Sequence, residues 1–191
     1  MSRPVLQVIA ASTRPGRRGI AVARWVQQLA EAHGGFDVEL VDLAEVALPV
    51  FDEPNHPRLR RYEHDHTKRW SATVDRADAF VFVVPEYNHS FPASVKNALD
   101  YLSHEWADKP AGLVSYGGVS AGLRAATALK PVLAALRMVP VVEAVSVPFF
   151  AQFLTDDDEF VPNAELEAGG KGMLDEVLRL TGALKALRAA A

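Results

Sequence analysis

A run of five apolar residues at positions 80–84 constrains the fold of this chain more than any other feature. It has no polar residue on either face, which is typical of a parallel strand buried on both sides of a sheet. A polar and aromatic segment, residues 85–92, follows it directly, and a helical pattern then runs over residues 90–104 with Ser90 as the expected N-cap. Ligands of open α/β sheets bind at the carboxyl ends of strands, so this segment is a candidate binding loop.

The rest of the chain alternates strand and helix patterns, which predicts a parallel sheet covered by helices on both faces. No repeat or linker interrupts the pattern, so we expect one domain over residues 1–191. A long loop is expected over residues 149–164. The predicted strands are residues 5–11, 38–43, 79–84, 111–116 and 139–147. The predicted helices are residues 19–33, 58–76 and 90–104, and two more whose apolar side chains lie within residues 125–136 and 173–187.

Composition excludes several classes of protein. The net charge is −4, which favours neither nucleic acid nor an anionic membrane as a partner. The chain has no cysteine, so disulfides, a thiol nucleophile and a cysteine-ligated metal are impossible. No apolar run approaches the roughly 20 residues that span a bilayer, and residues 1–4 lead into a strand without a signal-peptide pattern. A cytoplasmic protein is therefore expected.

Three turns carry the functional signal: residues 12–19, 85–90 and 115–118. They follow the first, third and fourth predicted strands. In a flavodoxin-like, three-layer doubly wound sheet of order 2-1-3-4-5, all three turns meet at one edge of the sheet. A simple structural connection explains each turn alone as well as a binding site does, because glycine-rich turns often follow strands. Their joint position is what predicts a binding site.

The residues of these turns suit a phosphorylated aromatic ligand. The first turn precedes a helix N-terminus and offers hydroxyls and arginines, which bind phosphate oxygens. Its candidates are Ser12, Thr13, Arg14, Arg17 and Arg18. The third turn has two glycines, Gly117 and Gly118, whose backbone can approach a flat ring without an intervening Cβ. Tyr87 and Tyr116 are expected beside the ring plane, and the backbone N–H groups of residues 86–88 are expected to meet its heteroatoms.

These turns resemble those of the NADPH-dependent FMN reductase family, flavodoxin-like flavoproteins that include chromate, quinone and azo-dye reductases. The similarity lies in Ser-Thr-Arg-Pro-Gly-Arg at residues 12–17, in Pro-Glu-Tyr-Asn-His-Ser at residues 85–90 with Lys-Asn-Ala-Leu-Asp at residues 96–100, and in Ser-Tyr-Gly-Gly at residues 115–118. It extends through nearly the whole chain and thins after about residue 150. Ala11 departs from the family pattern, which often has glycine there.

The resemblance implies an FMN-dependent oxidoreductase. NAD(P)H, either NADPH or NADH, passes a hydride to the flavin, which then reduces a quinone, azo, metal-oxyanion or free-flavin acceptor. It implies a homodimer or homotetramer, with no general acid or base and no metal. By the same resemblance, the cofactor-binding residues are Ser12, Arg14, Arg17, Gly19, Pro85, Glu86, Tyr87, Asn88, Ser115, Tyr116, Gly117 and Gly118.

Two other functional classes remain open. A flavodoxin-type electron carrier without NAD(P)H turnover shares the fold, but such carriers are strongly acidic and lack arginines in the phosphate loop. A response-regulator-like or hydrolase-like domain is a weaker alternative, because no acidic cluster follows the first strand and no G-x-S-x-G motif is present.

Smaller features have structural interpretations that we favour. His64 and His66 are two residues apart and suit a solvated helix start better than a metal site. Residues 156–159 are acidic and are expected to form a polar turn rather than a calcium site. Glu86 suits a backbone-binding loop better than a catalytic acid. The three tryptophans are expected to pack in the core. Phe149, Phe150 and Phe153 predict an interface or a ligand wall.

Overall fold

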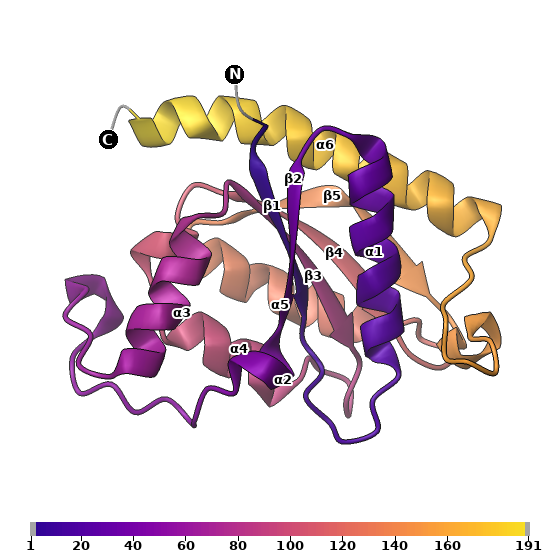
Figure 1. The fold of residues 1–191 in the computed structure, drawn as a ribbon, viewed down its shortest axis with the longest axis horizontal. Helices are drawn as coiled ribbons and strands as arrows, with labels where there is room; N and C mark the ends of the chain where they lie inside the picture. Colours follow the sequence, from indigo (N-terminus) through magenta and orange to yellow (C-terminus); the bar gives the residue numbers. More distant parts are fainter. Residues whose placement is uncertain (1–2, 190–191) are drawn as a thin grey trace.

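Five parallel strands form one sheet in the order β2-β1-β3-β4-β5, so the predicted fold class and strand order are confirmed (Figure 1). The computed structural model describes residues 3–189. Every predicted strand lies within one residue of its observed bounds. The strands are β1 (Val5–Ala10), β2 (Asp37–Asp42), β3 (Ala79–Pro85), β4 (Pro110–Tyr116) and β5 (Val139–Val147).

Helices cover both faces of the sheet and give three layers. The first core lies under α1 (Gly19–His33) and α6 (Ala164–Ala189). The second lies under α3 (Asp65–Asp75), α4 (Ala93–Asp100) and α5 (Leu123–Ala135). The predicted bounds of α1 are confirmed, and Gly34 ends the helix in the left-handed conformation, with φ of 76°.

Strand β3 is buried along its whole length, as its sequence predicts. Val81 and Val83 enter the first core, whereas Phe80 and Phe82 enter the second. Trp106 packs against Phe80 with their ring centres 5.0 Å apart. Trp25 and Trp70 are buried as well, so the tryptophans are packing residues, as predicted.

Two helix predictions are wrong in detail. Residues 58–76 do not form one helix. A short 3-10 helix, η1 (Pro57–Leu59), comes first, and α3 begins only at Asp65, because hydrogen bonds from another segment hold the backbone between them. The carboxylate of Glu53 accepts the N–H groups of Glu63 and His64, at 2.8 and 3.0 Å. Glu53 lies outside the predicted helix, and its two hydrogen bonds fix the backbone just before α3. Arg60 has a φ of 49°, which breaks any continuous helix.

The helix predicted over residues 90–104 is also shorter, and Ser90 is not its N-cap. Helix α4 begins after Pro92, and a second 3-10 helix, η2 (His104–Trp106), follows it. Ser90 instead pairs with Tyr87 through two backbone hydrogen bonds of 2.9 and 3.0 Å. The two residues between them, Asn88 and His89, have positive φ angles, which is the geometry of a tight hairpin turn.

The long loop after β5 is partly ordered by its own contacts. It begins with η3 (Phe150–Phe153), and a bridge between Leu154 and Phe160 then closes a turn. The acidic residues 156–159 lie in this turn, where Thr155 N–H donates to the Glu159 carbonyl at 2.9 Å, so the predicted polar turn is confirmed. Within residues 3–189 no helix has the length and apolar character needed to cross a membrane.

Lys109 is a buried charge just before β4, and only 4% of it is exposed. Its ammonium donates to the carbonyl oxygens of Val74 and Asp75, 3.0 and 3.3 Å away, at the end of α3. Burial lowers the pKa of Lys109 to about 8 from 10.5. The unfolded chain keeps the higher pKa, so above about pH 8 it binds more protons than the folded protein does. The free energy of unfolding contributed by Lys109 therefore rises with pH.

We expect this contribution to grow by about 1.5 kcal/mol between about pH 8 and about pH 9.5. The measurement is urea denaturation of the wild type and of Lys109→Met at each pH. Lys171→Met, on the exposed surface of α6, is the control and should follow the wild type. A stability difference between wild type and Lys109→Met that does not change with pH would contradict the assignment.

Candidate functional site

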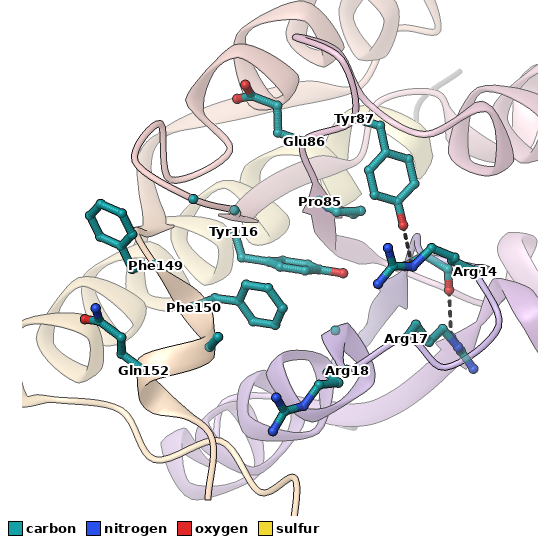
Figure 2. Close-up of a pocket in the computed structure, with 15 residues that line it drawn as sticks. Arg14, Arg17, Arg18, Pro85, Glu86, Tyr87, Tyr116, Phe149, Phe150 and Gln152 are labelled. Atoms are coloured by element: carbon teal, nitrogen blue, oxygen red, sulfur yellow. Dashed lines mark hydrogen bonds between the residues drawn. The ribbon is translucent and has the colours of Figure 1, made fainter.

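A cavity of about 520 Å³ opens at the carboxyl edge of the sheet, within the size range of small-molecule sites (Figure 2). Its walls come from the three predicted turns and from the loop after β5. Among the cofactor-binding residues implied by the resemblance, all but Asn88 and Ser115 line it, and the further phosphate candidate Thr13 does not. The lining residues are Ser12, Arg14, Arg17, Arg18, Gly19, Pro85, Glu86, Tyr87, Tyr116, Gly117, Gly118, Phe149, Phe150, Ala151 and Gln152.

One end of the cavity meets the N-terminus of α1. The hydroxyls of Ser12 and Tyr87 share a hydrogen bond of 2.9 Å there, which links the first and second turns. Helix α1 begins at Gly19, and a Cβ at this position would lie 1.8 Å from the Tyr116 hydroxyl oxygen. Only glycine therefore allows this contact. Helix N-termini favour anions, because their free N–H groups and the helix dipole both attract negative charge.

The three arginines of the first turn have different environments. Arg17 donates to both carboxylate oxygens of Asp42 and, at 2.7 Å, to the carbonyl of Ser12. The hydrogen bond to Asp42 raises the pKa of Arg17. Arg18 forms an ion pair with Asp158 in the polar turn. Arg14 is exposed on the cavity wall, and within residues 3–189 it has no ion-pair partner. Arg14 is therefore the cation of this turn that remains open to a ligand.

The other end of the cavity is formed by backbone. Gly117 N–H donates to the Val147 carbonyl at 3.2 Å, and Phe150 N–H donates to the Gly117 carbonyl at 3.1 Å. Phe149 N–H donates to the Gly118 carbonyl at 3.0 Å. These bonds fix the loop after β5 against the third turn. A Cβ at Gly118 would meet no atom within 4 Å, so this wall has an open face for a flat ligand.

The loop after β5 supplies four residues to the cavity wall, of which two were predicted. Phe149 and Phe150 line the cavity, as the ligand-wall interpretation predicts, whereas Phe153 packs against Phe160. Ala151 and Gln152 were not predicted to be near the site. Their position in the chain is the signal that could have identified them, because they follow β5, which ends beside β4 at the same edge of the sheet.

The two tyrosines that are expected beside the ring plane of a ligand both line the cavity. Tyr116 is 4% exposed, and its ring packs 5.0 Å from that of Phe150, with the hydroxyl directed toward the first turn (Figure 2). Burial raises the pKa of Tyr116. Tyr87 is 37% exposed and reaches the hydroxyl of Ser12. Both phenols therefore approach the anion end of the cavity.

Part of the predicted backbone role in the second turn is wrong. The N–H of Glu86 donates to the Tyr116 carbonyl at 3.2 Å, and that of Tyr87 donates to the Ser90 carbonyl at 2.9 Å, so neither is free for a ligand. Asn88 is exposed in the hairpin turn and does not line the cavity.

Ser115 also lies outside the cavity because strand residues alternate between faces. It is 1% exposed and donates to the Ala121 carbonyl at 2.8 Å, whereas its neighbour Tyr116 faces the cavity. Its hydroxyl therefore stabilises the turn before α5.

The alternative chemistries have little support in the geometry. The carboxylate of Glu86 is paired with Arg124 at 2.6 Å. Burial alone would raise the pKa of Glu86, but hydrogen bonds from Arg124 and Ser120 lower it, which does not suit a general acid. His66 bonds Asp52 at 3.0 Å. Among residues 3–189, no group of three or more histidine or acidic side chains is arranged to hold a metal ion.

Comparison with known proteins agrees with this geometry. The sequence model of the NADPH-dependent FMN reductase family matches residues 5–152. An NAD(P)H-dependent FMN reductase of Schizosaccharomyces pombe is 42% identical over 149 residues, which cover 76% of this chain and 74% of that protein. An NAD(P)H:quinone oxidoreductase of Solanum tuberosum is 32% identical over 133 residues, covering 64% of each chain.

A solved structure shares the fold. FerB, a flavoenzyme NAD(P)H:(acceptor) oxidoreductase from Paracoccus denitrificans, superposes with a TM-score of 0.74 at 22% identity, covering 94% of this chain and 98% of its own. The family match extends over all five strands and the three turns. The chain therefore belongs to the NADPH-dependent FMN reductase family and is an oxidoreductase that uses FMN and NAD(P)H.

Proposed function

We propose that the cavity binds FMN with its phosphate at the N-terminus of α1 and its ring between the second and third turns. The observation that carries this assignment is the guanidinium of Arg14 beside the start of α1, which has no ion-pair partner within residues 3–189 and lies at one end of a cavity whose other end is glycine backbone. An arginine fork suits a phosphate dianion, and the Ser12 hydroxyl adds a neutral partner. Gly117 and Gly118 suit the flat ring.

FMN fits the residues that are present. Its phosphate needs several donors, which Ser12, Arg14 and the first N–H groups of α1 can supply. Arg17 has a supporting part in this proposal, because its bonds to Asp42 and to the Ser12 carbonyl hold the loop in place. Bound FMN supplies the transfer of a hydride from NAD(P)H and of electrons to the acceptor. The protein binds the cofactor, orients it and partly shields it from water.

The proposed acceptors are small molecules, namely quinones, azo dyes, metal oxyanions or free flavin. Phe149 and Tyr87, at 49% and 37% exposure, are aromatic groups on the cavity wall that remain accessible. They favour flat aromatic acceptors, because aromatic faces stack well with rings. A quinone is accordingly the first acceptor to test, and the potato relative is named for that activity.

We also propose one FMN-binding domain over residues 1–191 that works in the cytoplasm as a homodimer or homotetramer. Val50 and Phe51, near α4, expose apolar side chains to solvent at 87% and 38% and support a contact between copies. Light scattering of the purified protein tests the assembly, and a monomer at micromolar concentration would exclude it.

The experiment that tests the function is an anaerobic visible spectrum. The purified protein is saturated with FMN, its absorbance is recorded, and NADPH or NADH is added. We expect flavin absorbance to bleach within seconds and to return when a quinone is added. Flavin that binds but does not bleach with either nucleotide would instead indicate an electron carrier. A protein that binds no flavin would overturn the assignment of the cavity.

A further inference from the structure

The side chain of Glu86, a residue that lines the cavity, points away from it (Figure 2), and its carboxylate is bonded to Arg124 in the first turn of α5. One carboxylate oxygen accepts from the Arg124 guanidinium at 2.6 Å, and the other accepts from the Arg124 backbone N–H at 3.2 Å. The Glu86 side chain is 8% exposed, whereas that of Arg124 is 48% exposed. The mostly buried carboxylate of Glu86 therefore has two hydrogen-bond donors, both of them on Arg124.

The start of α5 needs such a partner from outside the helix. Its N-cap is Gly122, which has no side chain to accept a hydrogen bond from the first turn. Glu86, which lies in the second turn, provides this acceptor, because its carboxylate accepts the N–H of Arg124. A negative charge is also favourable beside the positive end of the helix dipole.

This contact joins two walls of the cavity. Glu86 also donates its own N–H to the Tyr116 carbonyl at 3.2 Å, so this one residue bonds the second turn to the third through its backbone and to the start of α5 through its side chain. The third turn is closely packed, and a Cβ at Gly117 would lie 3.3 Å from the nitrogen of Gly122. Gly117 in turn holds the Phe150 N–H. The positions of the second turn, the third turn and the loop after β5 therefore all depend on the backbone of Tyr116 and Gly117.

We propose that Glu86 and Arg124 are a positioning pair that sets the distance between the second and third turns, and through it the affinity for the flavin ring. Arg124 does not line the cavity and acts only through Glu86 and the loop that follows β4. This inference rests on the proposed FMN site and adds a residue to it that lies outside the cavity.

Flavin binding tests the pair, with FMN and riboflavin compared because riboflavin lacks the phosphate. Arg124→Met and Glu86→Gln should each weaken both flavins by a similar factor, about 5- to 20-fold, since a charge-assisted bond is lost at the ring end. The double variant should bind no more weakly than about the weaker single variant, because both changes break one interaction. Arg124→Lys keeps the charge and the backbone N–H and should stay within about 3-fold of wild type.

Arg137→Met is the matched control. Arg137 pairs with Asp108 at 2.6 Å and is 64% exposed, and neither residue lines the cavity. It should bind both flavins as the wild type does. If Arg124→Met and Glu86→Gln also bind both flavins normally, or if they weaken FMN but not riboflavin, the pair does not position the ring site.

Hydrogen exchange of the protein without flavin gives a second readout. In Arg124→Met, the amides of Gly117, Arg124 and Phe150 should exchange at least about 5-fold faster than in wild type, while amides in β1 should not change. Unchanged exchange at all three amides would overturn the inference. This arm also separates the two proposals. A wild type that binds neither flavin refutes the FMN site, whereas the exchange rates still decide whether the pair holds the turns.

Discussion

Replacing Arg14 with alanine is expected to weaken FMN binding by about 1.5–3 kcal/mol, or about 10- to 150-fold. The reason is that Arg14 is the arginine of the first turn that has no ion-pair partner within residues 3–189, whereas Arg17 and Arg18 are paired with Asp42 and Asp158. A paired guanidinium offers less to a phosphate than a free one does. Fluorescence titration of the protein with FMN gives the dissociation constants.

Two controls make this result specific to the phosphate. Riboflavin should bind Arg14→Ala and wild type with the same affinity, because it has no phosphate to lose contact with. Arg24→Ala removes an exposed arginine from the same helix region outside the cavity and should bind FMN normally. Equal FMN affinity in Arg14→Ala and wild type would show that the phosphate lies elsewhere.

Gly122→Ala is expected to lower the free energy of unfolding by about 2–5 kcal/mol. Gly122 has a φ of 76°, which costs an alanine about 1–2 kcal/mol. Its Cβ would also lie 2.7 Å from the backbone nitrogen and 2.9 Å from the carbonyl oxygen of Tyr116. Backbone atoms of a buried strand cannot easily move, so overpacking adds about 1–3 kcal/mol.

Gly34→Ala separates these two costs. Gly34 has the same φ of 76° at the end of α1, but a Cβ there would meet no atom within 4 Å. It should therefore lose only about 1–2 kcal/mol, the cost of the left-handed conformation. Urea denaturation of both variants measures the difference. Equal losses would mean that the backbone near Tyr116 adjusts to the new methyl group, and the close packing of the third turn would not hold.

Local errors in the predicted elements have long-range causes. The periodic apolar residues of the segment 58–76 are compatible with one helix, but Glu53 takes the N–H groups of Glu63 and His64 from outside that segment. Ser90 has the chemistry of an N-cap, yet its backbone is used in the hairpin turn with Tyr87. In both cases, hydrogen bonds that periodicity does not describe overrode the local preference.

The sequence by itself determined the sheet, its order and the turns that form the cavity. These follow from properties that are local in the chain: the apolar run of β3, the alternation of strand and helix, and glycine and hydroxyl residues directly after strands. The carboxyl ends of neighbouring parallel strands must meet, so the positions of the turns followed from the order.

Only the tertiary structure decided which side chains of those turns are available. Arg17 and Asp42 are 25 residues apart, Arg18 and Asp158 are 140 apart, and Glu86 and Arg124 are 38 apart. Each pair forms only when the packed sheet brings its members together, and a charge that is neutralised by such a partner looks the same in the sequence as a free one. The chemistry left for a ligand is what remains after these distant pairs have formed.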